Sequence, residues 1–226
     1  MIRNVSLEDI SDGRFYTEND CVRTDTNNCA GCRTVCCQNM GNTIKLDPKD
    51  CFDIELATGC TFDALLGSGK VELNVVDGLI IPNLKMNEEN GRCAFLDESN
   101  RCIIHSSRPG ICRMFPLGRY WESKDKFHYI LQKGECNKDN LSKIKVKKWL
   151  GIEGLEEYNR YVVAWHELVK ELEEALSSLS EEQIRILNTF VLRMFYLAPF
   201  SGCSTTAQFY AEFDKRVNDA RVKLGM

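Results

Sequence analysis

The sequence predicts an α+β fold, in which a loop-rich cysteine domain with short helices and a β-hairpin is followed by three helices. Four cysteines fall within residues 29–37, a spacing that suits metal binding better than disulfide bridges. Asp77-Gly78, between two apolar runs, is a strong hairpin signal. From Leu155 onward apolar residues recur three and four apart, as in amphipathic helices. The pattern changes near residue 149, so we expect a cysteine-cluster metal-binding domain over 1–148 and a helical region packed on it over 149–226.

Composition restricts the classes of partner. With 226 residues and 43% apolar content the chain can form an ordinary buried core. Its net charge of −4 provides no general attraction to nucleic acid or an anionic membrane. No basic leader or membrane-length apolar run is seen, so we expect a cytoplasmic protein. Four lysines form a short basic cluster that we interpret as the solvated face of a connecting segment: Lys143, Lys145, Lys147 and Lys148.

The first part of the chain is predicted to contain short elements joined by turns. Residues 1–28 are polar and predict an extended or irregular lead-in. Capping residues and glycines predict a helix from Pro48 to Gly59 capped by Asp47, and a short helix over 62–66 after Thr61. Runs of apolar and β-branched residues predict strands at 44–46, 71–76, 79–81 and 127–131.

The second part is predicted to be helical throughout. An apolar stripe runs from Leu155 to Leu179 and indicates one long helix. A second helix has to end before Pro199, because the residue before a proline disfavours helical backbone. Capping boxes mark the starts of the second and third helices, and they are formed by Ser180 with Gln183 and by Thr205 with Gln208.

Eight of the twelve cysteines form a pattern that points to a metal centre. In a reducing compartment thiols stay free, and neighbouring cysteines meet disulfide geometry poorly. Thiolates around zinc or an iron–sulfur core need only short reach. The predicted ligands are Cys29, Cys32, Cys36, Cys37, Cys93, Cys102, Cys112 and Cys136.

The metal and the number of sites are left open by the residues alone. Tetrahedral zinc and a [4Fe-4S] cluster each take four ligands, so eight thiolates could serve two sites, or one site with sulfurs to spare. A loop could supply three ligands and a distant cysteine the fourth. Cys36 and Cys37 are adjacent, so one is expected to ligate while the other serves a second centre or packs. With few histidines in the chain we favour one or two [4Fe-4S] clusters, with zinc as the alternative.

Other residues near the pattern are given simpler roles. Arg108 and Arg113 bracket Cys112, where they could offset thiolate charge or else pair with carboxylates. His105 is expected to be a satisfied side chain rather than a ligand. Three cysteines outside the pattern are interpreted as small apolar residues: Cys51, Cys60 and Cys203. Cys21 is given the same interpretation, although it lies close enough to Cys29 in the sequence to replace a ligand.

Together these motifs resemble a known family. The first cluster, Cys93-Ala-Phe-Leu, Cys102-Ile-Ile-His and the segment Arg108-Pro-Gly-Ile-Cys-Arg-Met-Phe-Pro116 are similar to the YkgJ-type cysteine-cluster proteins, also called the CxxCxxCC or "putative zinc- or iron-chelating domain" family. Here three residues, not two, separate Cys32 from Cys36. The resemblance implies binding of iron–sulfur or zinc, and some relatives carry the label flagellin lysine methylase.

Two functional hypotheses follow. The first is an iron–sulfur protein with a redox or cluster-dependent enzymatic role, such as modification of a protein or peptide. The second is a non-catalytic module stapled by zinc, with the C-terminal helices as its interaction surface. Radical use of S-adenosylmethionine is disfavoured, because that chemistry usually has CxxxCxxC and the spacing here is reversed. No spacing identifies a hydrolase, and the oligomeric state is not set by the sequence.

Overall fold

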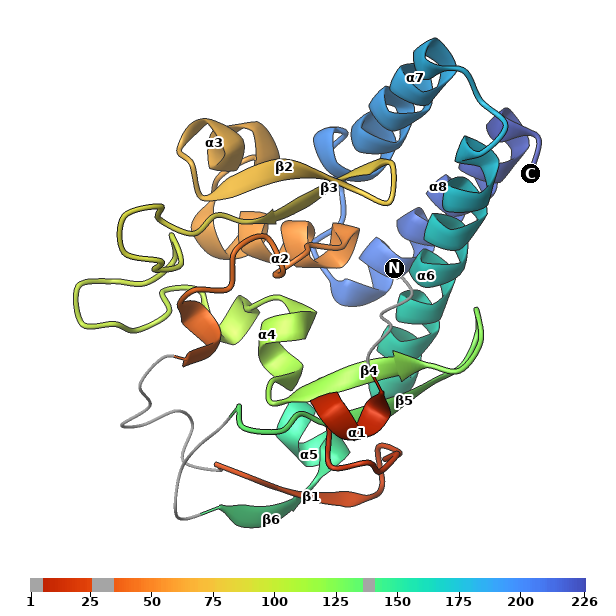
Figure 1. Ribbon diagram of the computed structural model, residues 1–226. Coiled ribbons are helices and arrows are strands. Elements are labelled where there is room, and N and C mark those ends of the chain that lie inside the picture. The colour runs from red at the N-terminus through yellow and green to blue at the C-terminus, as the bar shows by residue number, and fades with distance from the viewer. Residues whose placement is uncertain (1–5, 26–34, 136–140) are drawn as a thin grey trace.

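The computed structural model describes residues 6–25, 35–135 and 141–226, and within them it is an α+β protein (Figure 1). Its elements are α1 (Leu7–Ile10), β1 (Cys21–Thr24), the 3-10 turn η1 (Val35–Cys37), α2 (Pro48–Thr58), α3 (Phe62–Gly67), β2 (Val71–Val76), β3 (Leu79–Leu84), the 3-10 turn η2 (His105–Ser107), α4 (Gly110–Met114), β4 (Leu117–Trp121), β5 (Phe127–Leu131), β6 (Ser142–Lys145), α5 (Val146–Leu150), α6 (Leu155–Leu176), α7 (Glu181–Leu192), the π-helical turn η3 (Arg193–Leu197) and α8 (Thr206–Leu224).

Helix α2 forms where its capping residues predict. The Asp47 side chain accepts a hydrogen bond from the backbone N–H of Asp50, and the Asp50 carboxylate accepts one from the N–H of Asp47 in return. Pro48 occupies the first turn, where its missing N–H costs nothing. The helix ends at Gly59, which has a φ of 67° and so adopts the left-handed conformation that glycine favours. The short helix after Thr61 is also confirmed, as α3.

The predicted hairpin is present as β2 and β3, which pair antiparallel from Val76 with Leu79 to Val71 with Leu84. Asp77 and Gly78 both have positive φ, as a two-residue turn of this kind requires. Strand β3 is longer than expected and continues through Pro82. The predicted strand at 44–46 is reduced to one bridge, between Lys45 and Asn83.

Two further antiparallel pairs complete the strands of the described residues, β4 with β5 and β1 with β6. Strand β5 was predicted and β4 was not, since Gly118 and Arg119 interrupt its apolar pattern. The lead-in contains the extended strand β1, and it also contains the short helix α1, which was not expected. Strand β1 pairs with residues more than 110 positions later, a contact that local sequence does not encode.

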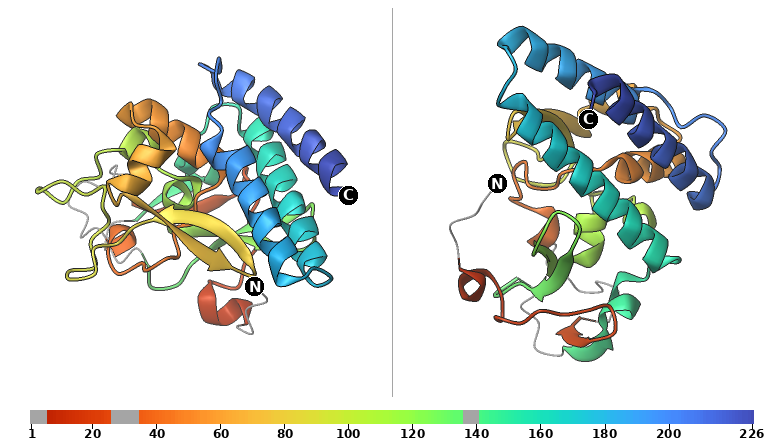
Figure 2. Two further views of the ribbon diagram at one scale, coloured as in Figure 1. Left: turned by 90° about the horizontal axis from the view of Figure 1, so that it is seen from above. Right: turned by 90° about the vertical axis from the view of Figure 1, so that its right-hand side faces the viewer.

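The three C-terminal helices lie side by side in both views of Figure 2. Both predicted capping boxes are present, at Ser180 and Thr205. Helix α6 ends at Leu176, slightly before the end of the apolar stripe, and η3 carries the chain from α7 towards Pro199. The Arg221 guanidinium on α8 binds the Glu171 carboxylate on α6 with two hydrogen bonds of 2.9 Å.

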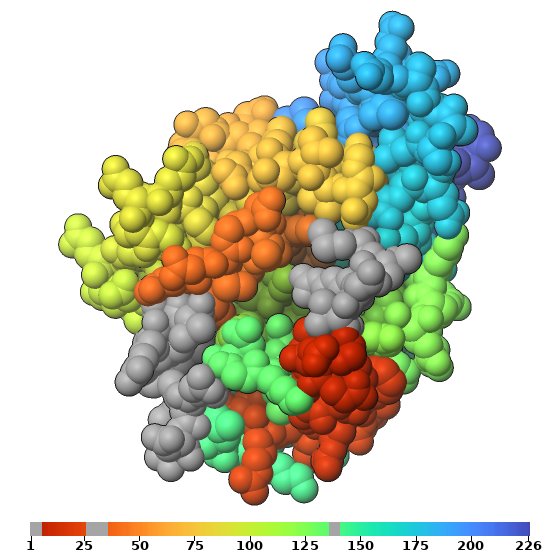
Figure 3. Space-filling view, in the orientation of Figure 1, coloured from red at the N-terminus to blue at the C-terminus, as the bar shows by residue number. Residues whose placement is uncertain are grey.

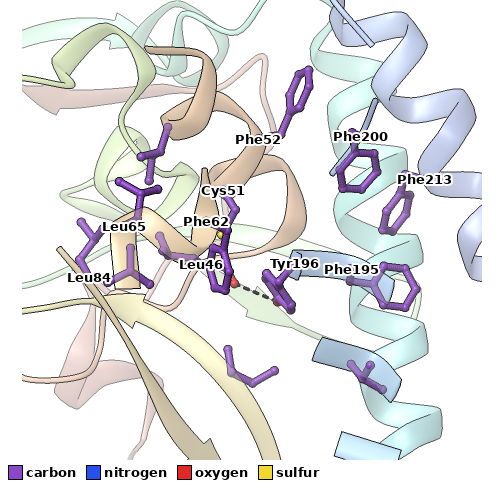
Figure 4. Packing of buried hydrophobic residues seen from close by; sticks show 14 of the residues in the cluster. Leu46, Cys51, Phe52, Phe62, Leu65, Leu84, Phe195, Tyr196, Phe200 and Phe213 are labelled. Carbon is purple, nitrogen blue, oxygen red and sulfur yellow. Dashed lines mark hydrogen bonds between the residues drawn. The ribbon is translucent and has the colours of Figure 1, made fainter. Parts of the chain in front are cut away.

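The main hydrophobic core joins the cysteine domain to these helices. The ring of Phe52 on α2 lies 4.9 Å from that of Phe209 on α8, and the ring of Phe62 on α3 lies 5.8 Å from that of Tyr196. Figure 4 shows Phe62 beside Tyr196 in this core, with the Tyr196 hydroxyl donating to the Leu46 carbonyl at 3.1 Å. The helical region therefore completes the core of the first part of the chain.

A second, smaller core lies under the β4–β5 and β1–β6 pairs. It contains Leu117, Tyr129, Val146 and Leu150, together with Met114 of α4. The boundary predicted between residues 148 and 149 falls inside α5, which contributes to this core. The division of the chain into two domains stays a prediction. The four lysines predicted to be solvated are all exposed.

Candidate metal centre

Five of the eight predicted ligands lie in the described residues, on three neighbouring segments. Cys36 and Cys37 form η1, Cys93 and Cys102 lie in the loop after β3, and Cys112 lies in α4. In Figure 1 these segments lie next to one another. Figure 3, in the same orientation, shows the chain that follows η1, in orange, at the surface of the molecule. The N–H of Cys93 donates to the carbonyl of Cys37 at 2.9 Å, which holds two of the segments together.

Cys36 and Cys37 form a pair of contacting thiols. Their Sγ atoms are 3.7 Å apart, and both side chains are partly exposed. The pKa of Cys36 falls to about 7, chiefly because the Cys37 thiol can donate a hydrogen bond to a Cys36 thiolate. A backbone hydrogen bond and, to a smaller extent, the charge of Arg108 lower it as well. The pKa of Cys37 is raised, first by the same hydrogen bond and then by burial. One thiolate is therefore available near neutral pH.

The other three sulfurs are close enough to this pair for their charges to interact. Burial is the largest cause that raises the pKa of Cys93, Cys102 and Cys112, and a thiolate at Cys36 raises each of them further. A cation would relieve this mutual repulsion, since metal binding favours deprotonated thiols. All nine cysteines of the described residues are free, as a thiolate centre requires.

The described residues do not by themselves make up a complete site. No group of three or more His, Cys, Asp or Glu side chains among residues 6–25, 35–135 and 141–226 is arranged to hold a metal ion. Cys29, Cys32 and Cys136 lie outside these ranges. The ligand set therefore stays a prediction, although soft thiol donors are the chemistry that zinc and iron–sulfur clusters use.

The two arginines that flank Cys112 differ in their contacts. The positive charge of Arg108 lowers the pKa of Cys36 and Cys102, and its guanidinium contacts the ring of His105. Arg113 donates to the carbonyl of Ser106 at 2.6 Å, which ties α4 to η2. Neither has a carboxylate partner in the described residues, so Arg108 is the better placed to offset thiolate charge.

A buried carboxylate holds α4 in place. The Asp50 Oδ1 atom accepts a hydrogen bond of 2.8 Å from the N–H of Gly110, two residues before Cys112. The pKa of Asp50 is raised, first by burial and then by the nearby Asp47. On the other side, the Tyr158 hydroxyl of α6 packs against Gly110 so closely that a β-carbon there would clash. Asp50 and Tyr158 were not singled out from the sequence; only the Asp47 capping signal, three residues before Asp50, pointed to the first.

The cysteines outside the pattern only partly follow their interpretation as buried apolar residues. Cys51 is 3% exposed and belongs to the main core. Cys60 and Cys203 are partly exposed and pack against the edge of that core. Cys21 is partly exposed in β1 opposite Lys145.

All three histidines of the chain have contacts away from these sulfurs. His105 contacts Arg108, as expected for a satisfied side chain. The His128 ring nitrogen Nε2 lies 3.1 Å from the Glu122 carboxylate, and the His166 ring stacks on Trp121 with centroids 3.5 Å apart. The predicted ligands that lie in the described residues are all cysteines.

Comparison with known protein families agrees with this arrangement. Residues 28–137 match the model of the CxxCxxCC family, whose description is "putative zinc- or iron-chelating domain". This segment is a CxxCxxCC domain. The domain starts one residue before Cys29 and ends one residue after Cys136, so it includes all eight predicted ligands.

The comparisons identify the CxxCxxCC domain and nothing further in the chain. No curated protein and no solved structure gives a significant match to the chain. Among the residues described, every helix is too short or too polar to cross a membrane.

Proposed function

We propose that the CxxCxxCC domain binds an iron–sulfur cluster of the [4Fe-4S] type and that the protein uses it in a redox or cluster-dependent reaction. The observation that carries the proposal is the group of five free cysteines, drawn from η1, the loop after β3 and α4, whose charges shift one another's pKa. A purely sulfur donor set is what such clusters use. With Cys29, Cys32 and Cys136 the predicted ligands number eight, enough for two such clusters or for one cluster with sulfurs to spare.

The surroundings of the sulfurs support a redox role. When bound, an iron–sulfur cluster supplies one-electron chemistry, and nearby positive charge and hydrogen bonds raise its potential. Arg108 acts on Cys36 and Cys102 in this way, because its charge favours their thiolate forms. Cys36, Cys37 and Cys102 are partly exposed, so a partner protein or peptide could come close to the centre. Modification of such a protein or peptide is the reaction class we propose.

Zinc in a non-catalytic binding module is the second candidate, and one observation favours it. Residues 85–104 have little regular structure beyond three isolated bridges, Met86 with Cys93, Leu96 with Cys102 and Arg92 with Gln38. A structural zinc ion stabilises loops of this kind, since its binding free energy becomes folding free energy.

Metal analysis under anaerobic conditions separates the two candidates. The protein is purified without oxygen, and its visible spectrum, iron, acid-labile sulfide and zinc are measured per chain. Broad absorption near 400 nm with about four iron and four sulfide per chain for one cluster, or about eight of each for two, supports the iron–sulfur proposal. Colourless protein with about one or two zinc ions supports the second candidate.

A pair of serine variants then tests the site. Cys93→Ser should lose most of the bound metal, whereas the matched control Cys203→Ser, which changes a free cysteine outside the domain, should keep it. Full metal content in Cys93→Ser, or no metal in the wild-type protein, would contradict the proposal.

A further inference from the structure

A groove between α7, η3 and α8 lies outside the CxxCxxCC domain. Its volume is about 550 Å³, within the range of ligand pockets. Ile186, Phe190 and Met194 form its apolar floor, and they follow one another at intervals of four residues along α7 and into η3. Side chains with this spacing line up on one face of a helix. Ile186 is 63% exposed, so this stripe is open to a partner.

Basic side chains border the floor on both sides. Arg185 and Arg193 lie one position before Ile186 and Met194, so they form a parallel stripe. Lys223 faces them from α8, with its Nζ atom 5.9 Å from the centre of the Phe190 ring. No acidic residue lines the groove in the part of the chain that the structure describes.

Arg185, Arg193 and Lys223 have no acidic partner within the described ranges, whereas two other arginines, both on α8, have one. Arg216 pairs with Glu212 and Arg221 pairs with Glu171. The chain as a whole has a net charge of −4, so three cations without carboxylate partners around an apolar floor are a local reversal of its charge. Such a patch attracts and orients a negatively charged partner.

We propose that this groove binds an acidic amphipathic helix of a partner protein. The floor extends over eight residues, or about 12 Å of helix, which matches two turns of a bound helix. Apolar residues of that helix, spaced three and four apart, would cover Ile186, Phe190 and Met194, and its carboxylates would reach Arg185, Arg193 and Lys223. The groove contains no cysteine, so this interaction does not depend on the proposed metal centre.

The probe is a displayed library of 16-residue peptides, with apolar residues at helical spacing and Glu, Lys, Gln or Ala elsewhere. Selection is made on the full-length protein as purified, and the enriched peptides are then measured by fluorescence anisotropy. We expect them to carry net negative charge and to bind at least tenfold more weakly in 0.5 M salt than in 0.05 M salt.

Variants place the interaction in the groove. The double variant Arg185→Glu, Arg193→Glu changes two exposed residues and should weaken binding at least tenfold. Ile186→Asp places a charge in the apolar floor and should weaken binding to the same extent. Arg160→Glu, an exposed charge reversal on α6, is the matched control and should bind like the wild type.

Three results would overturn the proposal. They are the absence of enriched peptides, enrichment without a charge bias, and unchanged binding in the double variant. Sedimentation velocity supplies a further check. Self-association of the wild type that the double variant abolishes would identify a second copy of this chain as the occupant, which also contradicts a partner helix.

Discussion

The Tyr158 hydroxyl lies 2.2 Å from the position where a β-carbon on residue 110 would stand. Only glycine allows α6 to pack so closely on α4, the helix that carries Cys112. The segment Arg108-Pro109-Gly110 therefore links the cysteine domain to the C-terminal helices as well as shaping the loop around the sulfurs.

A double-mutant cycle tests this contact. Gly110→Ala should lower the free energy of unfolding by about 1–3 kcal/mol, because the added methyl group overlaps the Tyr158 hydroxyl. The loss should be smaller when the same change is made in a Tyr158→Phe background, which lacks that oxygen. Urea unfolding followed by circular dichroism measures all four proteins. Equal losses in the two backgrounds would show that the contact is not the cause.

Removal of the Asp50 carboxylate should destabilise both helices that it serves. Asp50→Ala leaves the buried N–H groups of Gly110 and Asp47 without an acceptor, so we expect a loss of about 2–4 kcal/mol in the free energy of unfolding. Asp50→Asn keeps an acceptor oxygen and should lose less. Asp63→Ala, an exposed residue in the first turn of α3, is the control and should change stability by less than about 0.5 kcal/mol.

His166 should make stability depend on pH. Its pKa is lowered to about 4, first by burial and then by the charge of Lys170, so the folded protein favours the neutral ring. The unfolded chain takes up a proton near pH 6.5, and stability should therefore fall as the pH drops from 6.5 towards 4. Because the ring is partly exposed, we expect a loss of about 1 kcal/mol.

Unfolding at pH 7 and pH 5 checks this expectation. The difference in unfolding free energy between the two pH values should be about 1 kcal/mol smaller in His166→Gln than in the wild type. A difference that is the same in both proteins would assign the pH dependence to other groups.

Metal removal should lower the melting temperature of the whole chain in one step. At a metal concentration about 1,000 times its dissociation constant, binding adds about 4 kcal/mol, or about 10 °C for a protein of this size. Since Phe52 and Phe62 share a core with α8 and η3, the helical signal should be lost in the same calorimetric transition. Two separate transitions after chelation would show that the helices fold independently.

Elements with local signals could be predicted from the sequence. Asp47, Ser180 and Thr205 start helices because a side-chain oxygen can satisfy an N–H group a few residues away. Asp77-Gly78 specifies its hairpin for a similarly local reason, its positive φ angles. The cysteine spacing likewise identified the domain that the family model matches.

What could not be predicted depends on contacts between distant residues. The β1–β6 pair joins Cys21 to Lys145, and no feature of either segment's sequence indicates that the other is its partner. Asp50 lies in the first turn of α2, where its position indicates only a capping role, and its hydrogen bond to the N–H of Gly110 joins residues 60 positions apart. The aromatic core that both parts of the chain share, which predicts a single cooperative unit, is likewise built from residues far apart in the sequence.

The shared core limits how the protein can be shortened for study. A fragment that stops at the end of the family match, residue 137, would leave Phe52 and Phe62 without the rings of Phe209 and Tyr196 that cover them. Recombinant work on the sulfur centre should therefore retain α6–α8. A truncated protein would expose an aromatic surface and aggregate into inclusion bodies, whether or not its cysteines can bind metal.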